Sequence, residues 1–264
     1  MGHATINEQR WYYELEGPQD GSVVVFANGV LADTRVWGNQ VPVLSKRYRV
    51  LTFDFPGQGR SDALCRSVTV AEQAQGAASL LEHLKLDPVH WIGASYGGEV
   101  GLSLAVEHPQ RLRSLIVADS VAGVDANLAG RVGAWLAAAR SGDPELFFAV
   151  SLLDIFSPDY VRDHPRAIEA SRRQFHKLNL TSVVHLLERF GELELPHLDR
   201  IHARVLLLCG ELDALKPSHV MQAMAQRIPQ AEFLTVPGAG HALSLEKPEE
   251  FMTACLGFLA KQEA

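Results

Sequence analysis

Three side chains in this sequence have the types and the order that nucleophilic attack by a serine requires: Ser95, Asp213 and His241. A serine hydroxyl is a weak nucleophile at neutral pH, so it needs a general base within reach, and that base needs an orienting carboxylate. Ser95 stands in the stretch Gly93-Ala94-Ser95-Tyr96-Gly97-Gly98, which has the pattern G-x-S-x-G. We therefore predict Ser95 as the nucleophile, His241 as the base and Asp213 as the acid.

The residues around Ser95 predict a strand, a sharp turn and a helix. Val89–Ile92 is a short apolar run, and Glu99–Glu107 carries apolar residues at helical spacing. In that context the motif forms a nucleophile elbow, in which a strained backbone projects the serine hydroxyl out of the sheet. Gly93 and Gly97 have a steric reason to be glycine, because side chains at these positions would clash inside the turn.

The predicted base and acid each follow a strand downstream of the serine. Asp213 comes after the apolar run 205–209, and His241 comes after the run 233–236. Loops that follow parallel strands meet at one edge of a sheet, so we expect both side chains near Ser95. Glu211 is the nearest alternative for the acid, and Asp119 is a second one.

Attack on a carbonyl places negative charge on its oxygen, which backbone N–H groups must stabilise. Tyr96, the residue after the nucleophile, is predicted to supply one N–H. Val30, in the loop that follows the apolar run 22–27, is predicted to supply the other. We expect Asn28 to brace this loop, and we predict that Asn28, Gly29 and Trp37 contribute to substrate binding.

The wider pattern predicts an α/β fold with a mostly parallel sheet flanked by helices. Strand and helix signals alternate to about residue 120 and again from about 203, which is typical of a parallel sheet covered on both faces. We predict that 1–120 and 203–264 form this core. Between them, 121–202 has helix signals only, and we interpret it as an inserted helical lid.

The predicted lid is rich in apolar side chains. Phe147 and Phe148 are the residues of this segment that we predict to contact substrate. An apolar lid favours a substrate with an apolar acyl group.

Composition and charge indicate which partners, cofactors and location to expect. The net charge is -7, and no cluster of Lys and Arg indicates a nucleic-acid partner. No apolar run is long enough for a bilayer, and no secretion signal precedes the first strand, so we expect a cytoplasmic protein without a membrane partner. The three cysteines, Cys65, Cys209 and Cys255, match neither a disulfide framework nor a zinc site. We expect no metal and no cofactor, and a homodimer is left open.

Five short motifs stand in order along the chain: Asn28-Gly29, Asp54-Phe55-Pro56-Gly57-Gln58-Gly59-Arg60-Ser61, Gly93-Ala94-Ser95-Tyr96-Gly97-Gly98, Gly210-Glu211-Leu212-Asp213 and Gly240-His241. Together they resemble the α/β-hydrolase fold superfamily over essentially the whole chain. The resemblance implies a mostly parallel, eight-stranded α/β-hydrolase sheet flanked by helices, with the inserted helical lid. Asn28-Gly29 with Thr34 and Trp37 also resembles the 3-hydroxyacyl-carrier-protein acyltransferases, although these carry Trp at the position of Tyr96. The stretch before Trp37 is similar to that of enol-lactone hydrolases as well.

The residues and the resemblance together lead us to expect a serine hydrolase. Its substrate would be a small-molecule carboxylic ester or thioester with an apolar acyl group, cleaved through an acyl-enzyme. One alternative is an acyltransferase that moves a 3-hydroxyacyl group from a carrier thioester to an acceptor other than water. The others are an enol-lactone hydrolase and a hydrolase-like ligand receptor.

Overall fold

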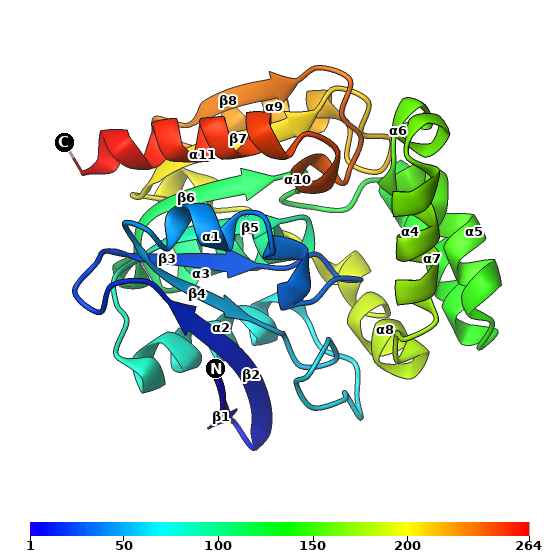
Figure 1. Cartoon of the computed structure of the whole chain (residues 1–264), viewed down its shortest axis with the longest axis horizontal. Coiled ribbons are helices and arrows are strands. Elements are labelled where there is room, and N and C mark those ends of the chain that lie inside the picture. The colour runs from blue at the N-terminus through cyan, green and yellow to red at the C-terminus, as the bar shows by residue number, and fades with distance from the viewer. Residues whose placement is uncertain (264) are drawn as a thin grey trace.

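The computed structural model describes residues 1–263 and contains one eight-stranded sheet in the order β1-β2-β4-β3-β5-β6-β7-β8 (Figure 1). The strands are β1 (Gly2–Ile6), β2 (Gln9–Glu16), β3 (Val23–Ala27), β4 (Arg49–Phe53), β5 (Val89–Ala94), β6 (Leu112–Ala118), β7 (Arg204–Gly210) and β8 (Glu232–Val236). β1 pairs with β2 and β2 pairs with β4 in antiparallel fashion, and the other neighbours are parallel. The predicted mostly parallel sheet is therefore confirmed.

Helices flank the sheet and also make up the segment between β6 and β7. They are α1 (Val41–Leu44), α2 (Val70–Leu84), α3 (Tyr96–Glu107), α4 (Ala126–Arg140), α5 (Pro144–Ile155), α6 (Pro158–Asp163), α7 (Pro165–Phe175), α8 (Leu180–Leu187), α9 (Ser218–Ala225), α10 (Leu243–Glu246) and α11 (Pro248–Gln262). Short 3-10 helices cover Thr34–Trp37, Pro109–Arg111, Phe190–Glu192 and Leu198–Arg200.

Successive residues of a strand point to opposite faces of the sheet, and here side chains on both faces are buried. Along β3, Val24 and Phe26 belong to a core that also holds side chains of α1 and α11. Val25 and Ala27 belong to the opposite core, which includes side chains of α2 and α3. This two-sided burial explains why the central strands are apolar runs without polar alternation.

Local caps define where several helices begin. The Thr69 side chain accepts a hydrogen bond from the Glu72 N–H, and the Glu72 carboxylate accepts one from the Thr69 N–H, which forms a capping box. Asp125 and Asp143 cap α4 and α5 more simply, because each carboxylate accepts backbone N–H groups of the first helical turn.

The chain between β6 and β7 forms a helical insertion, α4 to α8, at the side of the sheet where the strands β3 to β6 end (Figure 1). α4 packs against α5 and α8, and α5 packs against α7. In this part of the described chain, β-type pairing is limited to one isolated bridge between Gly123 and Glu194. The predicted lid boundaries, 121–202, fall within this insertion.

Two further expectations concern the environment of the protein. Within residues 1–263, no helix combines the length and the apolar character needed to cross a bilayer. The three cysteines are unpaired: Cys65 is exposed, whereas Cys209 and Cys255 are buried.

Candidate active site

The turn between β5 and α3 holds Ser95 in an unusual backbone conformation. Its φ is 51° and its ψ is -117°, a sparsely populated region for a residue with a side chain. A Cβ on Gly93 would lie 2.2 Å from the Gly97 carbonyl oxygen, and a Cβ on Gly97 would lie 2.2 Å from that of Ala27. Both glycines are thus required by close backbone approach, as the motif predicts.

The structure brings the three predicted catalytic side chains together. His241 Nε2 lies 2.9 Å from Ser95 Oγ, and His241 Nδ1 lies 2.8 Å from Asp213 Oδ2. Both distances are those of hydrogen bonds, with the serine hydroxyl donating to Nε2 and Nδ1–H donating to the carboxylate. The Asp213 carboxylate is held in place because its Oδ1 accepts the backbone N–H groups of Leu215 and Lys216.

The two alternative acids have other partners. Glu211 is exposed, and its carboxylate accepts the N–H of Gly238, which braces the loop that precedes His241. Asp119 is buried, and its Oδ1 accepts the N–H of Gly210 at 2.8 Å. Burial, together with the neighbouring Asp213 carboxylate, raises the pKa of Asp119 well above its usual range. Of the three carboxylates, Asp213 is the one that contacts the imidazole.

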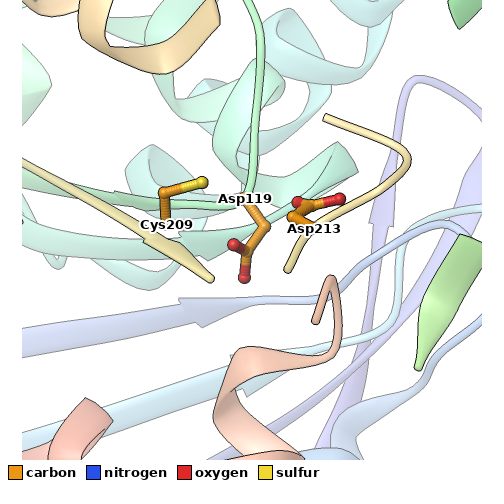
Figure 2. Close-up of side chains that lie close together, drawn as sticks. All are labelled: Asp119, Cys209 and Asp213. Atoms are coloured by element: carbon orange, nitrogen blue, oxygen red, sulfur yellow. The ribbon is translucent and has the colours of Figure 1, made fainter. Parts of the chain in front are cut away.

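Asp119, Cys209 and Asp213 form a buried cluster whose potential ligand atoms lie within 4.8 Å of one another (Figure 2). Burial raises the pKa of the Cys209 thiol, which favours the protonated form, and its Sγ is placed to donate to the Gly210 carbonyl. Asp213 already uses both oxygens in hydrogen bonds. A protonated thiol, a carboxyl group with a raised pKa and an engaged carboxylate suit hydrogen bonding better than metal ligation.

The two predicted oxyanion donors lie beside the nucleophile. Val30, Ser95 and Tyr96 line the same small cavity, and a Cβ on Gly29 would lie 3.6 Å from Ser95 Cβ. Among residues 1–263, no acceptor is paired with the backbone N–H of Val30 or of Tyr96. Tyr96 is the first residue of α3, so its N–H is also at the positive end of the helix dipole.

Asn28 and Trp37 belong to a buried hydrogen-bond network beneath this loop. Trp37 Nε1–H donates to Asn28 Oδ1 at 2.6 Å, and Asn28 Nδ2 donates to the Phe53 carbonyl at 2.9 Å. Asn28 has 0% exposure and does not line the cavity at Ser95. This position suits the bracing function that we expected. The Asn28 side chain does not reach the cavity, so its predicted contribution to substrate binding stays a prediction.

A cavity of about 410 Å³ opens at Ser95 and His241. Gly29 and Trp37 are among its lining residues, in agreement with their predicted positions. Most of the other lining side chains are apolar, including Leu31, Val36, Trp135, Ile155, Phe156 and Leu243. A second cavity of about 440 Å³ shares Val30, Asp33, Arg35 and Gln174 with the first but is lined mainly by polar groups and lacks Ser95.

Phe147 and Phe148 do not line the cavity at Ser95. Both are buried inside the insertion, where their rings pack against Phe175 at centroid distances of 5.4 and 5.1 Å. Trp135 and Phe175, which do line the cavity, both pack against Phe147. The two phenylalanines therefore lie behind residues that line the cavity, and their contact with substrate stays a prediction.

Sequence reasoning missed two charged residues next to Ser95. Lys216 Nζ lies 3.0 Å from Ser95 Oγ and 2.6 Å from Glu99 Oε1. The side chains are only 3% and 0% exposed. A signal for Glu99 was available, since a charged residue one turn after Ser95 interrupts an otherwise apolar helix. Lys216 is close to Asp213 in sequence, but only the fold shows its direction.

Comparisons with known proteins show that the fold is shared with α/β hydrolases. The profile of the family described as "alpha/beta hydrolase fold" matches residues 22–248. A Caulobacter vibrioides protein named "Putative carbamate hydrolase RutD" is 29% identical over 256 residues, with 94% of each chain covered. The crystal structure of MGS-M2, an alpha/beta hydrolase enzyme from a Medee basin deep-sea metagenome library, superposes with a TM-score of 0.94 at 26% identity and covers 98% and 97% of the two chains. A thermophilic esterase from Thermogutta terrifontis gives a TM-score of 0.90 at 26% identity, with 99% and 98% covered.

Proposed function

Because this chain belongs to the α/β-hydrolase fold family, we propose that it is a serine hydrolase of a carboxylic ester or thioester with an apolar acyl group. One observation carries the proposal. Ser95 Oγ lies within hydrogen-bond distance of His241 Nε2, at the wall of a largely apolar cavity of about 410 Å³. A base in contact with the hydroxyl and a place for an acyl group are the two requirements of acyl-enzyme chemistry.

In the first half of the reaction, Ser95 Oγ attacks the substrate carbonyl carbon while its proton passes to His241 Nε2. Asp213 keeps Nδ1–H of the ring oriented and stabilises the imidazolium that forms. The electron pair of the carbonyl moves to its oxygen, and we assign its stabilisation to the N–H groups of Val30 and Tyr96, which line the same small cavity as Ser95. When the tetrahedral intermediate collapses, the leaving group takes the proton from Nε2 and the acyl-enzyme remains.

In the second half, water replaces the leaving group. His241 Nε2 takes a proton from the water as its oxygen attacks the acyl carbon. The bond between that carbon and Oγ then breaks, and Oγ recovers its proton from the imidazolium. The acid product leaves, and the resting hydrogen bonds are restored.

The lining of the cavity supports an apolar acyl group, since side chains such as Leu31, Trp135 and Leu243 offer it few polar partners. The names of the relatives suggest further leaving groups that should be tested as substrates. The Caulobacter relative bears the name of a carbamate hydrolase and the Thermogutta relative that of an esterase. We therefore include aryl carbamates with aryl esters and thioesters in the substrate panel.

The experiment is steady-state hydrolysis of a p-nitrophenyl ester series from short to long acyl chains. We expect turnover that peaks at one chain length in the wild type and falls at least about 10³-fold in Ser95→Ala. Ser22→Ala is the matched control, since Ser22 lies just before β3, at the end of the strand remote from the site. Full activity of Ser95→Ala would reject the mechanism.

Mass spectrometry of the wild type separates hydrolysis from the alternatives. A single acyl group retained on Ser95 without turnover would favour transfer to another acceptor, and a hydroxyacyl thioester would then give a condensed product. Retention together with a ligand-induced rise in thermal stability would favour a receptor. Turnover of an enol-lactone in preference to open-chain esters would favour the lactonase.

A further inference from the structure

Lys216 and Glu99 form a buried ion pair directly beside the nucleophile. The ammonium lies 2.6 Å from Glu99 Oε1 and 3.0 Å from Ser95 Oγ. A third side of the ammonium faces the Phe190 ring, whose centroid is 5.5 Å away. Lys216, Glu99 and Ser95 also border a cavity of about 20 Å³ that shares Trp135 with the larger one. The pair therefore stands next to the reacting atoms.

Stability alone does not account for this pair. Two charges lose their hydration when they are buried, and apolar side chains of similar volume often stabilise a fold equally well. Glu99 Oε1 accepts a second hydrogen bond from the Val121 N–H at 3.1 Å, but Oε2 has no partner among the described residues. Burial raises the pKa of Glu99, and the ammonium opposes that shift. Such an arrangement points to a use in the site.

We propose that Lys216 is a further catalytic residue, whose ammonium activates Ser95 by donating a hydrogen bond to Oγ. The inference rests on the proposed function, because it assumes that Oγ is the nucleophile. Glu99 is a positioning residue: it holds the ammonium in place and balances its charge next to the imidazolium that forms during attack.

The hydrogen-bonding capacity of each group explains the effect. A lysine ammonium has three donors and no acceptor, so it occupies a lone pair of Oγ and leaves the serine proton directed at His241 Nε2. As that proton moves to Nε2 and Oγ bonds to the carbonyl carbon, the ammonium stabilises the negative charge that develops on Oγ. When the acyl-enzyme breaks down, the same contact stabilises Oγ as it leaves the acyl carbon and regains the proton. His241 remains the base throughout, because a charged ammonium cannot accept a proton.

The test measures the nucleophile directly. Ser95 is labelled with an alkyl fluorophosphonate, and the second-order rate is followed by mass spectrometry together with p-nitrophenyl ester turnover. The variant Glu99→Leu/Lys216→Met replaces the pair by apolar side chains and leaves no unpaired charge. We expect its labelling rate and its kcat to fall about 10- to 100-fold, which is the range for one charge-assisted hydrogen bond. Its free energy of unfolding should fall by no more than about 1–3 kcal/mol, because Glu99→Leu leaves the Val121 N–H without its acceptor.

The matched control is Glu232→Leu/Lys261→Met, which removes an exposed Lys–Glu pair of the same chemistry. It should label at the wild-type rate. If the apolar variant does not fold, Glu99→Gln/Lys216→Gln, which retains polar groups but no charge, takes its place. Labelling of the folded variant at the wild-type rate would overturn the inference.

Failure of the inference is distinguishable from failure of the proposed function. If the wild type is not labelled at Ser95, or if Ser95→Ala retains turnover, the serine mechanism itself is rejected. If the wild type is labelled and the apolar variant is labelled equally fast, only the assignment of Lys216 is rejected.

Discussion

Replacing Asn28 by alanine should destabilise the protein by an amount that the buried network allows us to estimate. In the wild type, Asn28 Oδ1 accepts the Trp37 indole N–H and Nδ2 donates to the Phe53 carbonyl. Asn28→Ala deprives the indole N–H and the carbonyl of their hydrogen bonds to Asn28, in the buried interior. Each unsatisfied group costs about 1–3 kcal/mol, so we expect a loss of roughly 4 kcal/mol.

The loss is measured by urea unfolding followed by circular dichroism and by the thermal midpoint. For a chain of this size, roughly 4 kcal/mol corresponds to a midpoint about 8–16 °C lower. Trp37→Phe keeps a ring that can stack on Phe26, whose centroid is 4.5 Å from that of Trp37, but removes the N–H. In Asn28→Ala/Trp37→Phe the unsatisfied donor is therefore absent. The double variant should be more stable than the sum of the single losses by about 1–3 kcal/mol.

The double-mutant cycle decides the case. Single losses that add within about 0.5 kcal/mol would show that the two side chains are not coupled. That result would refute the account of Asn28 as the brace of the loop before Val30.

Three further predictions concern other parts of the molecule. Because the pKa of Asp119 is raised in the folded protein, the unfolded chain loses this proton first as the pH rises, and the wild type loses stability by up to about 1.4 kcal/mol per pH unit above pH ~4. Asp119→Asn has no titratable group at this position, so its midpoint should gain on that of the wild type as the pH rises above ~4. A pH-independent difference would contradict the assignment. Gly97→Ala should prevent folding because its Cβ would meet the Ala27 carbonyl, whereas Gly130→Ala, in α4 with nothing within 4 Å, should add about 0.5–1 kcal/mol to the free energy of unfolding. Circular dichroism checks both, and a stable Gly97→Ala would reject the close approach. Ile155→Phe narrows the cavity at Ser95, so kcat/KM for long acyl esters should fall about tenfold relative to acetyl ester, and an equal change for both would argue against acyl binding there.

Much of this fold could be predicted because its signals are local. The caps at Thr69, Asp125 and Asp143 each define a helix start through contacts within three residues. Ser95 and His241 could be placed together because the loops after parallel strands share one edge of the sheet. These inferences need only the order of the elements and no knowledge of side-chain packing.

The features that escaped prediction depend on packing. The apolar residues of α5 are distributed around the helix and not along one face, so periodicity could not tell which of them meet the cavity, and Phe147 and Phe148 were predicted to contact substrate. The pairing of Glu99 with Lys216 joins residues on different elements, which no local pattern reports. The sequence around Asn28 is compatible with a loop brace and with a ligand contact, and only the complete burial of its side chain in the fold favours the brace.

The position of the helical insertion also has a consequence for how this protein can change. β6 and β7 pair directly, from Ser114 opposite Arg204 to Ala118 opposite Leu208, so the insertion leaves the sheet uninterrupted. The entropy lost on closing such a long connection grows only with the logarithm of its length, about 0.6 kcal/mol for each doubling. Natural selection or a protein engineer can thus exchange, lengthen or shorten these helices at little thermodynamic penalty from chain closure. Such changes can diversify the substrates that the cavity accepts. The strand that precedes Ser95 and the loops of Asp213 and His241 are then inherited unchanged.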